Sequence, residues 1–148
     1  MTVVVDVQTE IEIRRPPGEV AAYAMDPDRA PEWYENIERV DWRTAPPLAI
    51  GSRVAFVARF LGRRLAYTYE IRELVPGARL VMSTAEGPFP MRTTYEFHAT
   101  SSGATRMTLR NQGEPAGFSR IAAPMLAGAM RRANRKDLAR LKEIVEAR

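Results

Sequence analysis

Apolar and polar side chains alternate along residues 3–14 in a pattern that predicts a half-buried antiparallel strand. Every odd position in this range is Val, Ile or Thr, and from Asp6 onward every even position is polar or charged. A two-residue period of this kind places one set of side chains in a core and the other in water. Pro16 and Pro17 end the strand, and Pro17 suits the first turn of a helix.

The rest of the chain divides into two short helices, a run of strands and one long helix. The short helices are expected at 17–25 and 28–34, with Asp26 as a cap. Six strands follow, separated by turn signals such as Pro76-Gly77; they are expected at 37–45, 52–61, 64–74, 79–85, 91–99 and 105–112. Short turns at regular spacing predict an antiparallel meander. The expected fold is therefore α+β, with a sheet of about seven strands once the first strand is included.

Residues 118–148 form the longest predicted element, an amphipathic helix. Its apolar side chains recur with a 3.6-residue period; they are Phe118, Ile121, Ala122, Met125, Leu126, Ala129, Ala133, Leu138, Leu141, Ile144 and Val145. At about 45 Å for 30 residues, this helix is the only element long enough to cover the apolar face of the sheet, which must curl around it. Ala and Met dominate the first half of the stripe, so we expect a cavity beside that half. Pro124 either kinks the helix or starts its main segment.

Composition narrows the class of protein. With 148 residues, the chain fits a single domain spanning 1–148 with a sizeable core. It has no cysteine, which excludes disulfides, thiolate metal sites and cysteine nucleophiles. We recognise no signal peptide and no transmembrane segment, so we expect a soluble, cytoplasmic protein.

Positive charge is concentrated in the last helix. Residues 118–148 hold eight basic and three acidic side chains, a net charge of +5, whereas the rest of the chain holds 14 basic and 15 acidic ones. This pattern fits a solvated helix face whose bases offset the helix macrodipole. It also fits a surface for nucleic acid, anionic lipid or an acidic partner, although we do not expect nucleic acid to be the partner.

Several local sequences stand in the order found in one known superfamily. They are Val20 and Tyr23 with Asp26-Pro27, the Trp-containing stretch 31–36, Gly51, the strand 69–76 ending in a Pro turn, the Gly-x-Thr-x-apolar stretch 103–107, and the Leu-rich stretch 138–141. With the order of elements, they make the chain resemble the START-like, or SRPBCC, helix-grip superfamily, and most closely its polyketide cyclase/dehydrase and lipid-transport branch. The resemblance implies a curved sheet wrapped around the C-terminal helix. It implies no single activity, because the fold hosts carriers, cyclases, hydroxylase domains and non-enzymatic binders.

The sequence offers little for catalysis or metal binding. The single histidine, His98, falls on the outward face of its strand, and no His and carboxylate cluster has metal-ligand spacing. No Gly-rich phosphate loop is present. Alternation turns strand carboxylates such as Glu70 and Glu96 outward. It does the same for Arg59 and Arg92, although a strand bulge could reverse either one, and an inward Arg92 would favour an anionic ligand. We therefore expect no cofactor, no metal and no buried acid/base pair.

Aromatic and hydroxyl side chains, in contrast, point toward the inside of the predicted grip. The candidate ligand-binding residues on the strands are Trp42, Phe56, Tyr67, Tyr69, Thr84, Thr93, Tyr95 and Asn111. Trp33, Tyr34 and Phe89 are expected at a cavity mouth, and Met125 and Ala129 on the helix wall. Ligand pockets are mostly apolar with a few placed polar groups, although aromatic residues at alternating strand positions also serve simply as core. Asn111 is the most specific candidate, because a buried amide without a partner costs about 1–3 kcal/mol.

Three functions remain open at this point. The first is a binding protein for a hydrophobic or amphipathic small molecule, such as a lipid, polyketide or aromatic compound. The second is an enzyme of the cyclase or dehydratase type that acts on such a ligand through positioning and a few polar groups. The third is an interaction module that uses the basic helix. The oligomeric state is left open between monomer and homodimer.

Overall fold

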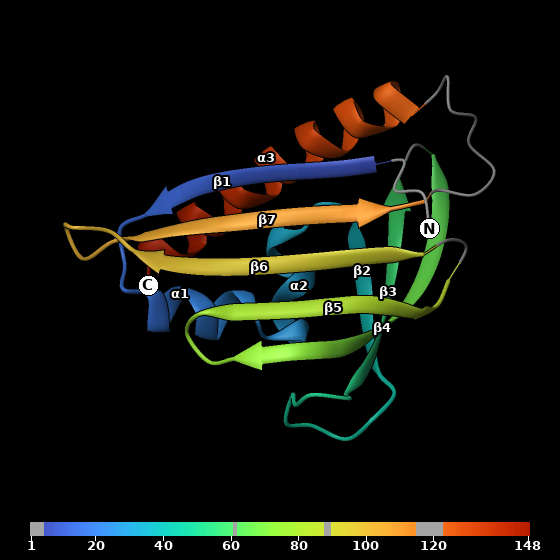
Figure 1. Cartoon of the computed structure of the whole chain (residues 1–148), viewed down its shortest axis with the longest axis horizontal. Helices are drawn as coiled ribbons and strands as arrows, with labels where there is room; N and C mark the ends of the chain where they lie inside the picture. The colour runs from blue at the N-terminus through green and yellow to red at the C-terminus, as the bar shows by residue number, and fades with distance from the viewer. Residues whose placement is uncertain (1–4, 61, 88–89, 115–122) are drawn as a thin grey trace.

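Seven strands and one long helix make up most of the chain in a computed structural model (Figure 1), which describes all residues except 1–4, 61, 88–89 and 115–122. The elements in chain order are β1 (Val5–Ile13), α1 (Pro17–Ala24), the 3₁₀ turn η1 (Pro27–Arg29), α2 (Ala30–Trp33), β2 (Ile37–Trp42), β3 (Arg53–Phe60), β4 (Arg63–Val75), β5 (Arg79–Glu86), β6 (Met91–Ala99), β7 (Thr105–Gly113) and α3 (Ala123–Glu146). The predicted order of elements is confirmed.

The strands form one sheet in the order β1-β7-β6-β5-β4-β3-β2, and every neighbouring pair is antiparallel. Strands β2 to β7 follow one another as a meander. β1 then joins the edge of β7, with Val5 opposite Gly113 and Ile13 opposite Thr105. In Figure 1, β2 and β3 run across the direction of β6 and β7, so the sheet is strongly curved, and α3 lies along β1. This arrangement is the expected helix grip.

The main core joins the sheet to all three helices, and it fixes the C-terminal half of α3. Alternation along β1 turns the odd-numbered side chains inward and leaves the even-numbered ones exposed, and Ile13 is the buried β1 residue of this core. Leu138 and Leu141 of α3 are almost completely buried in the same core. Burying an aliphatic side chain of this size contributes roughly 1.5–3 kcal/mol. The branched half of the helical stripe therefore holds α3 against the sheet.

The N-terminal half of α3 packs against a separate and much smaller cluster. Its buried members are Val5 and Val7 of β1 and Leu126 of α3. Pro124 lies in the first turn of α3, where a missing backbone N–H breaks no helical hydrogen bond. The predicted start of the helix, at 118–122, lies outside the described residues.

Polar contacts hold the end of α3 to the end of β1. Glu146 Oε2 accepts the backbone N–H of Arg14 at 2.8 Å and the ammonium group of Lys142 at 2.7 Å. These donors lower the pKa of the Glu146 carboxyl to about 2. The Arg15 guanidinium donates to the carbonyl oxygen of Arg148 at 3.2 Å. The C-terminal end of α3 is thus fixed by apolar and polar contacts together.

Some boundaries differ from the predicted ones. The predicted helix at 28–34 divides into η1 and α2, and the predicted strand at 37–45 ends at Trp42. His98 and Arg92 are exposed, as the alternation predicts. None of the described helices has the length and apolar character needed to cross a membrane.

Candidate functional site

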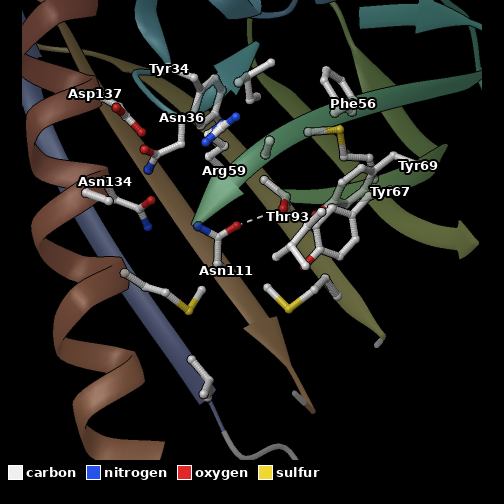
Figure 2. A pocket seen from close by; sticks show the side chains of 18 of the residues that line it. Tyr34, Asn36, Phe56, Arg59, Tyr67, Tyr69, Thr93, Asn111, Asn134 and Asp137 are labelled. Carbon is white, nitrogen blue, oxygen red and sulfur yellow. Dashed lines mark hydrogen bonds between the residues drawn. The ribbon is translucent and has the colours of Figure 1, made fainter. Parts of the chain in front are cut away.

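A cavity of about 220 Å³ lies between the concave face of the sheet and α3 (Figure 2). Its walls come from the segment after α2, from all seven strands and from the helix residues Leu126, Met130 and Ala133. The cavity therefore lies beside the Ala/Met part of the helical stripe. It is smaller than the roughly 300–1,000 Å³ of pockets for drug-sized ligands, so it suits a compact molecule.

One wall of the cavity is aromatic. Phe56 of β3 lies opposite Tyr67 of β4 in the sheet, and Tyr69 is the next inward residue. The ring centroids of Phe56 and Tyr69 are 5.7 Å apart in an edge-on arrangement, and those of Tyr67 and Tyr69 are 6.1 Å apart. Burial raises the pKa of both tyrosine hydroxyls. The wall thus offers flat apolar surface and neutral hydroxyl groups.

Two tyrosine hydroxyls from distant parts of the chain meet inside the cavity. Tyr34, directly after α2, and Tyr95, on β6, are hydrogen-bonded to each other through their hydroxyl oxygens. Burial raises the pKa of both hydroxyls. Trp33 packs behind them, with ring centroids 3.9 Å from Tyr34 and 5.9 Å from Tyr95. In such a pair, the hydroxyl that accepts keeps its own hydrogen for a further partner.

Thr93 and Asn111 face each other across the β6–β7 pair and supply a second polar point. They are register partners, and the Thr93 hydroxyl donates to Asn111 Oδ1 at 2.8 Å. Figure 2 shows this bond on the cavity wall. The amide predicted to need a partner therefore has one, and its Nδ2 group remains available to a ligand because no hydrogen bond from it occurs among the described residues.

Helix α3 adds two polar side chains, Asn134 and Asp137, which Figure 2 shows on the side of the helix that faces the sheet. Asp137 is only 3% exposed, and its Oδ1 accepts the backbone N–H of Glu35 at 3.0 Å. Burial raises the pKa of its carboxyl from 3.8 to about 6. Asn134 is also buried, and its Nδ2 group has no hydrogen-bond partner in the described part of the chain.

Asp137 corrects the expectation, drawn from strand alternation, that almost no carboxylate lies inside the grip. That expectation considered the strand carboxylates and overlooked the helix. The sequence does contain a signal: Asn134 and Asp137 lie four and seven residues after Met130, and Leu141 lies four residues after Asp137. This spacing places all four on one helical face. The two polar residues interrupt the apolar stripe at the positions where the helix faces the cavity.

Arginine side chains mark the rim. Arg59, near the end of β3, and Arg63, at the start of β4, line the cavity and are exposed. The guanidinium of Arg59 also donates to Glu38 Oε1 at 2.6 Å. The prediction that Arg59 faces wholly outward is therefore wrong, because this long side chain lies near the strand end and contributes to the rim.

The structure brings together six of the twelve candidate ligand-binding residues on the cavity wall. They are Phe56, Tyr67, Tyr69, Thr93, Tyr95 and Asn111. Five others lie elsewhere: Trp33, Trp42, Thr84, Met125 and Ala129. Phe89 lies outside the described residues. Tyr34, Asn36, Asn134 and Asp137 line the cavity without having been among the twelve.

The five residues that lie away from the cavity wall are buried in the core, bonded to other residues or turned to another side of the helix. Trp33 is fully buried in the core behind Tyr34, and Trp42 donates from Nε1 to Asp28 Oδ1 at 2.8 Å. The Thr84 hydroxyl accepts the Met91 backbone N–H at 3.0 Å and so closes the β5–β6 hairpin.

On the helix, Met125 is 79% exposed and Ala129 lies off the cavity wall. Both precede the lining residues Leu126 and Met130 by one position, which turns them by about 100° around the helix. Among the described residues, no three His, Asp or Glu side chains lie close enough together to hold a metal ion.

The sequence matches a known family over almost its whole length. The model of the family described as polyketide cyclase/dehydrase and lipid transport matches residues 4–146. No protein of curated function matches the sequence significantly.

Solved structures with low sequence identity share the fold. The structure of the protein TTHA0849 from Thermus thermophilus superposes with a TM-score of 0.83 at 22% identity, over 96% of this chain and 97% of that one. The Zhui aromatase/cyclase from a Streptomyces species gives 0.79 at 15% identity, over 95% and 93%. A START superfamily protein from Mycobacterium smegmatis gives 0.80 at 12% identity, over 96% and 97%.

Proposed function

Because the chain belongs to the polyketide cyclase/dehydrase and lipid transport family, we propose that it binds a compact, largely apolar small molecule that carries oxygen substituents. The cavity of about 220 Å³ supports this proposal more than any other observation. An aromatic or polyketide-like molecule fits the wall of Phe56, Tyr67 and Tyr69, because flat rings stack favourably on aromatic side chains.

The polar groups support a ligand with oxygen atoms at more than one point. Donors are available at Asn111 and Asn134, and a third comes from the Tyr34–Tyr95 hydroxyl pair. Hydrogen bonds to such groups fix the orientation of a ligand in an otherwise apolar pocket. A ligand carbonyl or hydroxyl would also satisfy Asn134 Nδ2, since a buried donor without a partner costs about 1–3 kcal/mol.

A thermal-shift assay with fatty acids of increasing chain length, naphthols and anthraquinones tests the proposal. We expect the compact aromatic compounds to raise the melting temperature, because a ligand at about 100 times its Kd stabilises the folded state by about 2.7 kcal/mol. Ala133→Leu fills the cavity from the helix and should abolish the shift. Ala139→Leu, on the exposed face of the same helix, is the matched control and should keep it. A shift that is equally large in both variants would contradict binding in the cavity.

A catalytic role of the cyclase or dehydratase type is the second candidate, and Asp137 favours it. A carboxyl group with a pKa of about 6 exchanges protons readily near neutral pH, and this one lines a cavity that also holds four neutral tyrosine hydroxyls. Turnover of a poly-β-ketone mimic should then fall in Asp137→Asn while binding of the same compound persists. Identical product distributions with and without the protein would rule this candidate out.

A further inference from the structure

The middle of α3 carries a basic patch that consists of Arg131, Arg132, Arg135 and Lys136. Three of these side chains are exposed and Arg131 is half-buried. None of the four forms an ion pair with any residue that the structure describes. On the sheet, in contrast, many arginines are paired, as in the Arg110–Asp6 bridge at 2.7 Å. The patch is therefore a concentration of uncompensated positive charge.

The helix macrodipole does not account for this placement. Cations stabilise a helix through its dipole only within about the last turn. The last turn of α3 contains no basic residue, and Lys136 lies ten residues before the end of the helix at Glu146. The expectation that the basic residues of this helix offset its macrodipole therefore fails for the four patch residues. Their placement is explained either by solvation alone or by a partner.

An exposed apolar side chain lies on the same face as the patch. Met125 is 79% exposed, and Arg132 and Lys136 follow it by seven and eleven residues, which returns to the same side of the helix. On the adjoining face, Leu126 and Met130 line the cavity. Clusters of Lys and Arg on an amphipathic helix bind anionic lipid surfaces, and an exposed apolar side chain beside them adds apolar area that the interface can bury. A nucleic-acid phosphate would pair with the cations but leave the methionine in water.

We propose that the basic patch and Met125 dock the protein on an anionic phospholipid surface, with the helix wall of the cavity next to the bilayer. The docking depends only on the charge and the exposure of these side chains. Its consequence, that an apolar ligand passes between bilayer and cavity with little exposure to water, rests on the proposed binding function.

Vesicle flotation tests the docking with two triple variants of equal charge change. Arg132→Glu, Arg135→Glu and Lys136→Glu together reverse the patch. Arg43→Glu, Arg92→Glu and Arg106→Glu together are the control, because these arginines are exposed and make no ion pair among the described residues.

The wild type should float with phosphatidylcholine/phosphatidylglycerol vesicles at low salt and stay unbound with phosphatidylcholine alone. Each cation near an anionic surface adds about 5-fold in partitioning, so the patch variant should lose about 100-fold or more. The control should lose far less, and Met125→Ser should weaken binding without removing its salt dependence.

Four results would overturn the proposal. They are no flotation at low salt, equal flotation with neutral vesicles, a patch variant that floats no worse than the control variant, and a duplex DNA that binds more tightly and displaces the vesicles. The naphthol thermal shift separates this proposal from the binding function. If the patch variant keeps both the naphthol shift and full flotation, docking through the patch is refuted and the binding function stands. If the wild type floats but shows no naphthol shift, the binding function is refuted and the docking stands.

Discussion

Asp137 should make the protein less stable as the pH rises through about 6. Its carboxyl has a pKa of about 6 in the folded state, against an ordinary value of 3.8, because burial disfavours the charged form. Below about pH 3.8 the group is protonated in both states and costs nothing. Above about pH 6 it is ionised in both states, and the folded state alone is penalised. At about 1.4 kcal/mol per pKa unit, the full penalty is about 3 kcal/mol.

The variant Asp137→Asn removes this titration with little change of shape. An asparagine oxygen can still accept the Glu35 backbone N–H that Asp137 Oδ1 now accepts. The variant should therefore gain stability over the wild type as the pH rises, by about 1.5 kcal/mol between about pH 5 and about pH 8.

Urea unfolding of both proteins at a series of pH values measures this difference, and ¹³C NMR of the Asp137 carboxyl gives its pKa directly. A stability difference that stays constant between about pH 5 and about pH 8, or an NMR titration near the ordinary value of an aspartate, would refute the reasoning.

Three further predictions concern packing and the ends of elements. Gly113→Ala should lower the free energy of unfolding by about 1–3 kcal/mol, because its new Cβ would lie 2.7 Å from the Pro90 carbonyl oxygen; Gly128→Ala, with open space around its Cβ, should instead raise it by about 0.5–1 kcal/mol. Leu141→Ala should cost about 2–5 kcal/mol in urea unfolding, and a loss below about 1 kcal/mol would show that Leu141 is not part of the core. Glu146→Gln should flatten the loss of stability as the pH falls from about 4.5 toward about 2, because the lowered pKa of Glu146 stabilises the fold only while the group is ionised; identical acid-unfolding curves would contradict this.

The sequence predicts the sheet well because strand alternation is a local signal. The period-2 pattern of β1 and the inward positions of Tyr67 and Tyr69 on β4 appear in the structure on the expected faces. Asn111 is also predictable as a residue that needs a partner. Its partner Thr93 follows only from the register of β6 and β7, which one strand alone does not specify.

The helix wall is harder to predict because an apolar stripe is wider than the line of residues that meets a cavity. Met125 fits the stripe but lies at the exposed start of α3. Asp137 is polar and so is not counted in the apolar stripe, yet its place in the helical period puts it on the inward face. Tyr34 lies in the segment between α2 and β2, and its contact with Tyr95 depends on how that segment packs against the sheet. These placements are set by tertiary packing, which local periodicity does not contain.

The unequal packing of α3 has a consequence for motion. Its C-terminal half is held by the main core and by Glu146, whereas its N-terminal half rests on the small cluster around Leu126. Opening free energies follow the number of buried contacts, so the two halves should exchange amide hydrogens at very different rates. The first turns of α3 can then detach and return as a unit while the sheet stays folded. Such a hinged half-helix would widen the way into the cavity beside Leu126 by local unfolding, in addition to the opening at the rim of Arg59 and Arg63.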